Sequence, residues 1–339
     1  MGEARSPEER GRGGRNVVPL AVPALIAGLI GWLLWGNLTI GTTRISVESA
    51  RLPAAFDGFT IAQVSDLHNA EFGAYNERLI GILRAERPDA IAITGDLVDL
   101  NHTNIDVATV FALRAAQLAP CYFIMGNHEA WLGSDYAVLE KRLLAAGVTV
   151  LHNQAVTLSS NGERIALLGI DDPERAEPYA SDPAAITNAE LAGIEPGADF
   201  TILLAHRPEQ FPSYVAHGID LVLSGHAHGG QFRIPFVGGV VAPDQGLFPR
   251  YDAGLYEQGN INYKFKVNDD LSVYPVLGAT VSMGIHGKDL AYEDSEYRKP
   301  INKETDSGEL FGKSGRMYRF EVSPEIGVLF RFNKFDKCL

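Results

Sequence analysis

Short apolar runs alternate with stretches of helical periodicity through residues 59–224. Five of these runs are typical of buried strands: "FTIAQVS", "DAIAIT", "CYFIM", "DFTILLA" and "IDLVLS". Between the first runs, residues 75–88, 104–118 and 134–147 place apolar side chains at the spacing of an amphipathic helix. Strands that alternate with helices of this length predict an α/β fold, with a sizeable sheet covered by helices.

Polar residues follow these five runs at the points where the strands are expected to end. They are Asp66 and His68, Asp96 and Asp99, Asn127 and His128, His206, and finally His226 and His228. Each one alone has an ordinary interpretation as a helix cap, a turn residue or a hydrogen-bonded core histidine. Because ligands bind at the carboxyl ends of strands in open α/β sheets, their recurrence at five strand ends favours one shared cleft.

The side chains at these strand ends indicate a metal site of a particular kind. Carboxylate, imidazole and amide donors without thiolate suit Mn, Fe, Zn, Co or Mg. There are more donors than one ion requires, which favours two divalent ions about 3.5–4 Å apart and bridged by a carboxylate. Such a pair activates a water molecule and stabilises both oxygens of an in-line displacement at phosphorus. The two cysteines, Cys121 and Cys338, indicate neither a disulfide framework nor a thiolate site.

The ordered segments "SDLH", "GDLVD", "GNHE", "LLAHRP" and "GHAHGGQ" lie within residues 60–231. They resemble the motifs of the calcineurin-like metallophosphoesterase superfamily, and most of all its membrane-anchored or exported bacterial phosphoesterases. The resemblance implies a four-layer α/β (α+β) fold, in which two mixed β-sheets form a sandwich flanked by helices. It also implies a dinuclear metal site at the edge of the sandwich. This fold replaces the simple doubly wound sheet that the pattern alone suggests.

The resemblance further implies a set of seven metal ligands. These are Asp66, His68 and His228 for the first ion, Asn127, His206 and His226 for the second, and Asp96 as the bridge between the two. A bridging hydroxide then attacks phosphorus. The division agrees with donor chemistry, because a carboxylate can bridge two ions while a neutral imidazole binds one.

Two catalytic residues are implied as well. His128 faces the phosphate, where it protonates the leaving oxygen or stabilises the developing charge. Asp99 is expected to hydrogen-bond His128 and keep it protonated, since a neighbouring carboxylate raises the pKa of an imidazole. Arg207 has two open interpretations, a phosphate contact or a solvated residue at the start of a helix. Three further histidines match no motif and are interpreted as structural: His102, His152 and His217.

The N-terminal region carries a different signal. Residues 16–43 contain no charged side chain, and residues 17–35 are almost wholly apolar. This length favours an uncleaved transmembrane anchor at 16–40 over a signal peptide, whose apolar core is usually shorter. Four arginines precede the anchor, so the positive-inside rule predicts a cytoplasmic tail at 1–15. The phosphoesterase domain, 41–339, is then expected outside the cytoplasmic membrane, with an unrecognised excursion at about 260–310.

The sequence therefore predicts a metal-dependent hydrolase of phosphate esters, either a phosphodiesterase or a phosphomonoesterase. The predicted anchor favours lipid- or envelope-linked substrates. One alternative is a UDP-diacylglucosamine-type pyrophosphatase of lipid A synthesis, but its substrate would be cytoplasmic and conflicts with the predicted orientation. A second alternative is a non-catalytic, metal-stabilised protein that binds a partner through the excursion, and the intact ligand set argues against it. No nucleic-acid partner is expected at a net charge of -13.

Overall fold

The computed structural model describes residues 18–234, 237–254, 256, 263–267 and 328–334. The helices in this part of the chain are α1 (Val18–Leu38), α2 (Glu77–Glu86), α3 (Ile105–Ala116), α4 (Asn127–Ala130), α5 (Ser134–Ala145), α6 (Pro183–Ala192) and α7 (Phe211–Ala216). The strands are β1 (Thr43–Ser49), β2 (Thr60–Val64), β3 (Ala90–Thr94), β4 (Cys121–Ile124), β5 (Val148–Val150), β6 (Gln154–Ser160), β7 (Glu163–Gly169), β8 (Thr201–Leu204), β9 (Leu221–Leu223), β10 (Phe232–Ile234), β11 (Gly238–Ala242), β12 (Gly246–Leu247), β13 (Tyr263–Val267) and β14 (Val328–Lys334). The predicted tail at 1–15 and most of the excursion at 260–310 lie outside the described residues.

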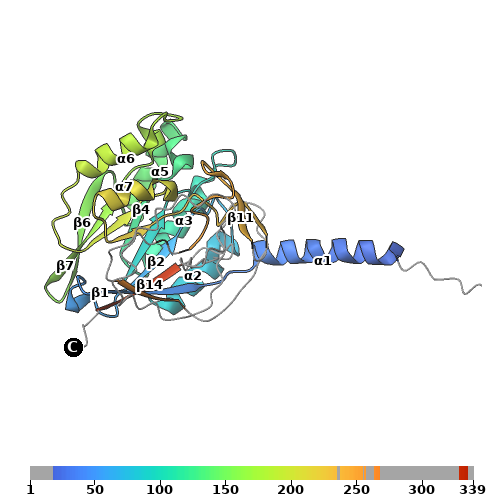
Figure 1. Cartoon of the computed structure of the whole chain (residues 1–339), viewed down its shortest axis with the longest axis horizontal. Coiled ribbons are helices and arrows are strands. Elements are labelled where there is room, and N and C mark those ends of the chain that lie inside the picture. Colours follow the sequence, from blue (N-terminus) through green and yellow to red (C-terminus); the bar gives the residue numbers. More distant parts are fainter. Residues whose placement is uncertain (1–17, 235–236, 255, 257–262, 268–327, 335–339) are drawn as a thin grey trace, which may run out of the picture.

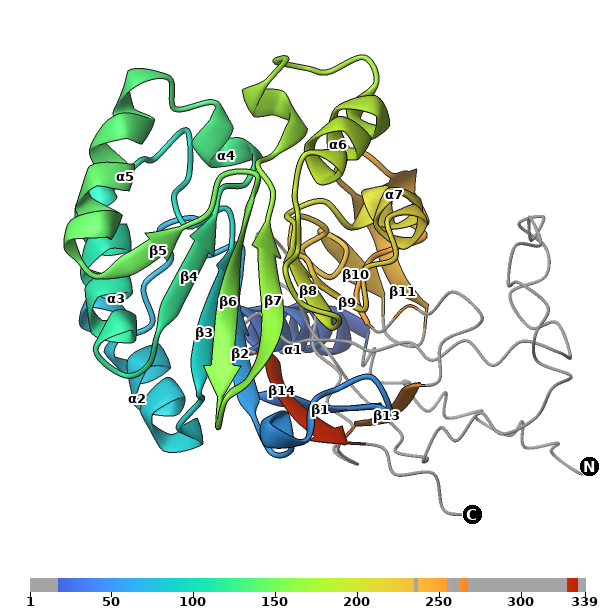
Figure 2. The same cartoon turned by 90° about the vertical axis from the view of Figure 1, so that its left-hand side faces the viewer.

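The larger sheet is mixed and has seven strands in the order β13-β1-β14-β2-β3-β4-β5. Strands β2 to β5 run parallel to one another, while β14 runs antiparallel to β2 and parallel to β1. All five residues of β3 are buried, as expected for a parallel strand covered on both faces. Helices α2, α3 and α5 cover one of these faces (Figure 2), and apolar side chains such as Leu83, Phe111 and Leu139 fill the space between.

The smaller sheet has four strands in the order β6-β7-β8-β9, with β7, β8 and β9 parallel. Its inner face packs against the larger sheet, where Ile61 and Ala92 of one sheet share a core with Leu167 and Ile202 of the other. Helices α6 and α7 cover its outer face (Figure 2). The result is the four-layer arrangement of helices, sheet, sheet and helices that the sequence predicted.

A third sheet, which the sequence analysis did not predict, is formed by β10, β11 and β12. It follows the His226 loop directly and lies against it. Gly230 has a φ of +85°, and a Cβ there would lie 2.3 Å from the Cα of Gly239 in β11. Only a glycine allows the two backbones to approach so closely. This contact fixes the turn between β11 and β12 relative to the histidine loop.

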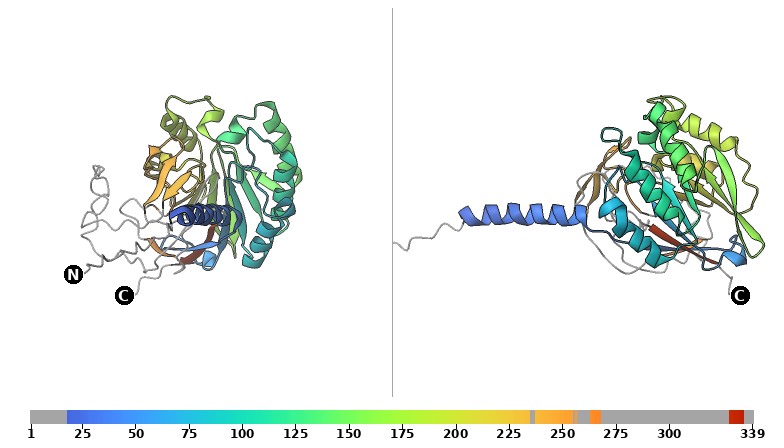
Figure 3. Two further views of the ribbon diagram at one scale, coloured as in Figure 1. Left: turned by 90° about the vertical axis from the view of Figure 1, so that its right-hand side faces the viewer. Right: turned by 180° about the vertical axis from the view of Figure 1, so that it is seen from behind.

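Helix α1 extends away from the rest of the domain (Figures 1 and 3). The apolar side chains along it that the structure describes are exposed: Val22, Leu25, Ile26, Leu29, Ile30 and Leu34. Within the described residues, no helix reaches the length and apolarity needed to cross a bilayer. The predicted transmembrane helix at 16–40 is therefore not shown by the structure.

His152 links a helix of the larger sheet's outer layer to the segment that follows β7. Its Nδ1 lies 2.6 Å from Oδ1 of Asp171, and its Nε2 lies 3.0 Å from Oε1 of Glu140 in α5. The hydroxyl of Tyr136 is 3.2 Å from Nε2, and Nη1 of Arg175 is 3.1 Å from Nδ1. A carboxylate faces each ring nitrogen, so the doubly protonated ring fits best. The hydrogen bond to Asp171 accordingly raises the pKa of His152.

We predict that His152→Gln destabilises the protein more at pH 6 than at pH 9. A histidine whose pKa is raised by folding contributes its full stabilisation below its unfolded pKa of about 6.5. The contribution is lost as pH rises through the higher folded-state pKa. A contribution of about 1 kcal/mol corresponds to a Tm difference of about 2–4 °C, measurable by calorimetry at both pH values.

His217→Gln is the matched control, because Nε2 of His217 faces the amide oxygen of Asn188 rather than a carboxylate. Its Tm difference from the unsubstituted protein should not follow the same trend with pH. An equal effect of His152→Gln at pH 6 and pH 9 would show that the ring does not stabilise the fold through its charge.

Candidate metal centre

The predicted ligands all lie just beyond the carboxyl ends of parallel strands. Asp66 and His68 follow β2, Asp96 follows β3, Asn127 begins α4 after β4, His206 follows β8, and His226 and His228 follow β9. In the larger sheet β2, β3 and β4 are parallel neighbours, and in the smaller sheet β8 and β9 are. The two sets of strand ends therefore meet at one edge of the sandwich, and each of the seven side chains is almost fully buried.

The backbone turns sharply where these side chains are presented. Asp66, His68, Asp96, His226 and His228 all have positive φ values, between 44° and 65°. A left-handed backbone costs of order 1–3 kcal/mol for a residue other than glycine, and persists only where its surroundings enforce it. Hydrogen bonds between the loops do this here. The N–H of Asp66 donates to the carbonyl of Gly95 at 3.1 Å, and the N–H of His68 donates to the carbonyl of Asp96 at 2.9 Å.

Glu129, a residue of the "GNHE" segment to which the sequence assigned no role, holds the loops after β3 and β4 together. Its buried carboxylate accepts hydrogen bonds from the backbone N–H groups of Asp96 at 2.8 Å, Gly126 at 2.8 Å and Val98 at 3.0 Å. Burial raises the pKa of Glu129 to about 7. The loops lie so close that a Cβ on Gly126 would be 2.2 Å from Oδ1 of Asp96. A glycine is therefore required at this position.

The donor atoms form two groups that share Asp96. One consists of Asp66, His68, Asp96 and His228, and the other of Asp96, His206 and His226, with the donor atoms of each group within 4.8 Å of one another. Oδ2 of Asp96 lies 3.5 Å from Nε2 of His68 and 3.2 Å from Nε2 of His206. Oδ1 of Asn127 lies 3.2 Å from the same nitrogen of His206. The structure thus brings together the side chains that the resemblance implied as ligands, and their division between two ions stays a prediction.

Several donors in these groups are buried and have no hydrogen-bond partner. Within the described residues they include Oδ2 of Asp66, both ring nitrogens of His68, and Nδ1 of His226 and of His228. An unsatisfied buried polar atom costs about 1–3 kcal/mol, so a cluster of them needs a ligand to explain it. His206 differs, because its Nδ1 lies 2.7 Å from the carbonyl oxygen of Thr94 and donates to it. Its Nε2 faces Oδ2 of Asp96 and Oδ1 of Asn127, and in the neutral ring this nitrogen carries the lone pair that can bind a cation. The oxygen and nitrogen donors present thus fit divalent metal ions.

The histidines around Asp96 favour the ionised form of its carboxylate. Burial opposes its ionisation, but His206, His68 and His128 outweigh burial and hold the pKa of Asp96 well below its usual value. Burial likewise opposes a charge on His206, yet the carboxylate of Asp96 raises the pKa of His206 to about 10. Burial lowers the pKa of His228 to about 4. A metal ion competes with protons for these nitrogens, so a bound cation and a charged His206 exclude each other.

His128 lies beside the two donor groups, with its ring centre 4.4 Å from that of His68. The predicted hydrogen bond from Asp99 is wrong. Nδ1 of His128 accepts the backbone N–H of Leu100 at 3.0 Å, while Oδ2 of Asp99 is 3.8 Å away from it. Asp99 instead accepts the backbone N–H groups of Asn101 and His102, each at 2.8 Å.

These contacts also correct the predicted protonation of His128. Because a donor points at Nδ1, that nitrogen is unprotonated, and the ring carries its proton on Nε2. Burial lowers the pKa of His128 and outweighs the carboxylate of Asp99, which raises it as predicted. The neutral ring therefore presents an N–H group, and not an imidazolium, to the space next to the donor groups.

Arg207 stands at the start of a helical turn, as one interpretation had it, but it is buried and not solvated. Its side chain is 3% exposed. Nε donates to Oδ2 of Asp172 at 2.7 Å, Nη2 lies 3.1 Å from Oε1 of Glu174, and Nη1 donates to Oδ2 of Asp244 at 2.6 Å. Carboxylates from the 172–174 turn and from the β11–β12 turn, together with Glu209 at 3.7 Å, thus surround the guanidinium, an arrangement that no local sequence pattern reveals.

Two further residues at the site were missed by sequence reasoning. Trp131, just after α4, has its ring centre 5.5 Å from that of His128, and its indole N–H donates to Glu174. Asp244, between β11 and β12, has its Oδ2 2.9 Å from Nε2 of His226. Trp131 lies close to the "GNHE" segment, which could have drawn attention to it. Asp244 lies beyond every motif and has no signal in the sequence.

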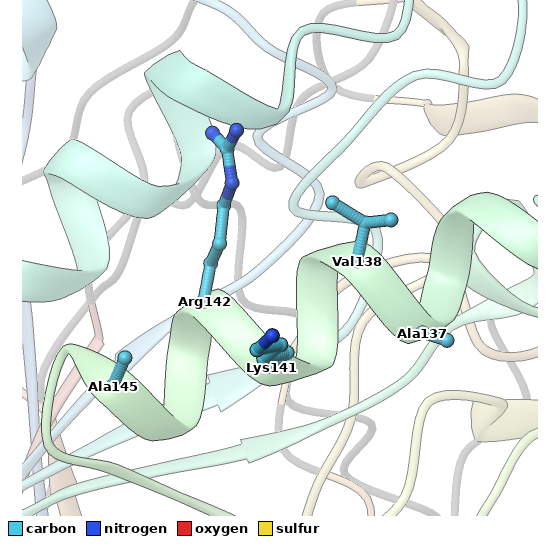
Figure 4. Close-up of a pocket in the computed structure, with 5 residues that line it drawn as sticks. All are labelled: Ala137, Val138, Lys141, Arg142 and Ala145. Atoms are coloured by element: carbon cyan, nitrogen blue, oxygen red, sulfur yellow. The ribbon is translucent and has the colours of Figure 1, made fainter.

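A depression lies on the surface of α5 (Figure 4). It has a volume of about 410 Å³ and is lined by Ala137, Val138, Lys141, Arg142 and Ala145. Arg142 is paired with Asp106 of α3. This surface contains none of the predicted catalytic or metal-binding residues, so the chemistry of the site does not depend on it.

Comparison with known proteins agrees with this geometry. The calcineurin-like phosphoesterase family matches residues 59–230. The uncharacterized metallophosphoesterase YkuE of Bacillus subtilis (strain 168) is 31% identical over 255 residues, covering 69% of this chain and 85% of that protein. Phosphodiesterase YaeI of Escherichia coli (strain K12) is 30% identical, covering 58% of this chain and 70% of that protein. A Bos taurus transmembrane protein with a metallophosphoesterase domain is 28% identical, covering 66% of this chain and 51% of that protein. This chain belongs to the calcineurin-like phosphoesterase family and is a phosphoester hydrolase.

Proposed function

We propose that the protein hydrolyses phosphodiesters with two divalent metal ions, which are held by the two donor groups on either side of Asp96. The observation that carries this proposal is the buried cluster of donor atoms without hydrogen-bond partners, divided into two groups that share one carboxylate. The choice of a diester is supported by the name of the similar phosphodiesterase YaeI. Mn, Fe, Zn, Co and Mg all suit these donors.

The residues of the chain divide the work of this reaction. Two bound divalent ions would polarise the phosphate and lower the pKa of a water nucleophile. Asp66, Asp96 and the histidines around them would hold the two ions, and their burial excludes bulk water from the site. His128 directs its Nε2–H toward a phosphate or leaving oxygen, with its ring fixed by the N–H of Leu100. A neutral ring donates a hydrogen bond more readily than a proton, which favours charge stabilisation over protonation of the leaving oxygen.

We further propose that α1 holds the domain at a membrane, where lipid- or envelope-linked phosphate esters are within reach. The support is the uncharged stretch at 16–43 and the exposed apolar side chains of α1, among them Leu25, Leu29 and Leu34. Transfer of such side chains from water into lipid is favourable. The name of the similar Bos taurus transmembrane protein points the same way. The arginines of residues 1–15 favour an extracytoplasmic position for the domain.

The first prediction concerns turnover. The full-length protein with Mn²⁺ should hydrolyse bis-p-nitrophenyl phosphate faster than p-nitrophenyl phosphate, as followed by release of nitrophenolate. Chelation with EDTA should abolish turnover, and added Mn²⁺ should restore it. Absence of metal-dependent turnover of both compounds would contradict the proposal, and a preference for the monoester would replace diesterase by monoesterase activity.

The second prediction separates metal binding from catalysis. His128→Ala should lower kcat about 100- to 1,000-fold, because a hydrogen bond to the reacting phosphate is lost. Its metal content, measured by mass spectrometry after dialysis, should match that of the unsubstituted protein. Asp96→Asn should lose both turnover and metal, because it removes the carboxylate that both donor groups share.

Asp99→Asn is the matched control for His128→Ala. An asparagine oxygen still accepts the N–H groups of Asn101 and His102, and Asp99 makes no hydrogen bond to His128. Its kcat should therefore stay within a few-fold of that of the unsubstituted protein. Loss of metal from His128→Ala would refute the role given to His128, and a large loss of kcat in Asp99→Asn would restore the predicted pair.

The third prediction concerns the membrane. The full-length protein should sediment with the membrane fraction and stay there in high salt. Replacing both Leu29 and Ile30 of α1 by Lys should move it to the soluble fraction with its hydrolysis of bis-p-nitrophenyl phosphate retained. Leu144→Lys on α5, where the leucine is 53% exposed, should change nothing. Recovery of the unsubstituted protein in the soluble fraction would contradict the proposal.

A further inference from the structure

Asp244 lies in the turn between β11 and β12, outside the residues 59–230 that match the family. The turn is held in place by its neighbours. The side-chain amide of Gln245 donates to the carbonyl of Tyr251 at 2.8 Å, and its oxygen accepts the N–H of Tyr251 at 2.8 Å. The approach of Gly230 to Gly239 fixes the same hairpin against the histidine loop. Asp244 is therefore placed by the third sheet, and not by a loop that is free to move.

The side chain of Asp244 reaches inward although it is itself 51% exposed. A single oxygen, Oδ2, makes both of its inward contacts. It lies 2.9 Å from Nε2 of His226 and accepts Nη1 of Arg207 at 2.6 Å. Each of these two partners is 3% exposed. Asp244 thus contacts His226 from the solvent side, while the ring of His226 faces Asp96 and His206 on its other side.

The hydrogen bond to Asp244 determines which nitrogen of His226 can bind a cation. A carboxylate oxygen can only accept, so Nε2 of His226 carries the proton. Nδ1 of the neutral ring then has a lone pair, and this atom is buried without a partner in the structure. His206 is fixed in the same manner from the opposite nitrogen, since its Nδ1 donates to the carbonyl of Thr94. Histidines that bind metals are commonly oriented by a hydrogen bond to their other nitrogen.

Arg207 holds Asp244 in position for this contact. Two bonds to Asp172 and one contact with Glu174 fix the guanidinium from the other side. The same guanidinium offsets the negative charge that Asp244 brings to the edge of the centre. His206 and Arg207 are neighbours in the fourth motif and have different roles. His206 belongs to the donor group, and Arg207 holds the carboxylate that orients His226.

We propose that Asp244 is a positioning residue of the metal centre, which fixes the ring and the tautomer of His226 so that Nδ1 faces the second ion. This inference rests on the dinuclear centre proposed above. It also assigns a role to the third sheet, which carries the orienting carboxylate. Glu209, His226 and Asp244 have donor atoms within 4.8 Å of one another, so a direct role of Asp244 as the ligand of an additional ion is the competing explanation.

The test is a titration of the metal-depleted, full-length protein with Mn²⁺, followed by calorimetry and by metal analysis after equilibrium dialysis. The unsubstituted protein should bind two ions. Asp244→Ala should weaken one of the two sites about 10- to 100-fold and leave the other unchanged. Asp244→Asn should weaken that site less, because an amide oxygen still accepts the N–H of His226. The metal-free variants should keep the far-ultraviolet circular dichroism of the metal-free unsubstituted protein, although loss of the contact with Arg207 is expected to lower their Tm.

Asp252→Ala is the matched control. The carboxylate of Asp252 belongs to the same region, accepting the N–H of Gly239 at 2.8 Å and the hydroxyl of Tyr256 at 2.9 Å. Asp252→Ala should leave both metal sites unchanged. If Asp244→Ala and Asp252→Ala weaken the same site equally, Asp244 acts only by supporting the hairpin, and the proposal is overturned. Two unchanged sites in Asp244→Ala, or loss of a third ion, also overturn it. Fewer than two ions in the unsubstituted protein would instead refute the dinuclear centre.

Discussion

The buried carboxylate of Asp96 is the point on which the site depends. Its Oδ2 lies within 3.5 Å of one imidazole nitrogen from each of the two donor groups. Its Oδ1 accepts the backbone N–H of His128 at 3.0 Å, and its own N–H donates to Glu129. These contacts join the ends of β2, β3 and β4 to the end of β8, so one residue connects both sheets of the sandwich. The loops can close around Asp96 only because Gly126 has no side chain.

The centre combines an unfavourable backbone conformation with buried polar atoms that have no hydrogen-bond partner. Five of the seven predicted ligands have a left-handed backbone, and several of their polar atoms are buried without partners. Both features cost free energy. The apolar core between the sheets and the two helical layers offset this cost. Structure that is unfavourable by itself but enforced by its surroundings is typical of sites prepared for a ligand.

The histidines of the site share one feature, a hydrogen bond that fixes which ring nitrogen carries the proton. A hydrogen bond at one ring nitrogen determines the chemistry of the other. The carbonyl of Thr94 accepts a hydrogen bond from Nδ1–H of His206, and the carboxylate of Asp244 accepts one from Nε2–H of His226. The backbone N–H of Leu100 donates to Nδ1 of His128. The first two rings are thereby left with a lone pair for a cation, and the third with an N–H group for an oxygen. Residues with the same side chain thus acquire different roles from their partners.

The sequence by itself determined the order of strands and helices in residues 59–224 and the polar residues at the strand ends. These follow from local periodicity and from motifs in which each polar residue comes directly after its own strand. Periodicity alone suggested a doubly wound sheet, and the four-layer fold was implied only by the resemblance of the motifs to a known family. The tertiary structure decided what the periodicity does not encode. It replaced Asp99 by Leu100 as the partner of His128, buried Arg207 among carboxylates, and brought Asp244 from the third sheet to His226. Each of these contacts joins segments that are distant in the chain or depends on how a loop folds back, and such distances are set only when the sheets pack together.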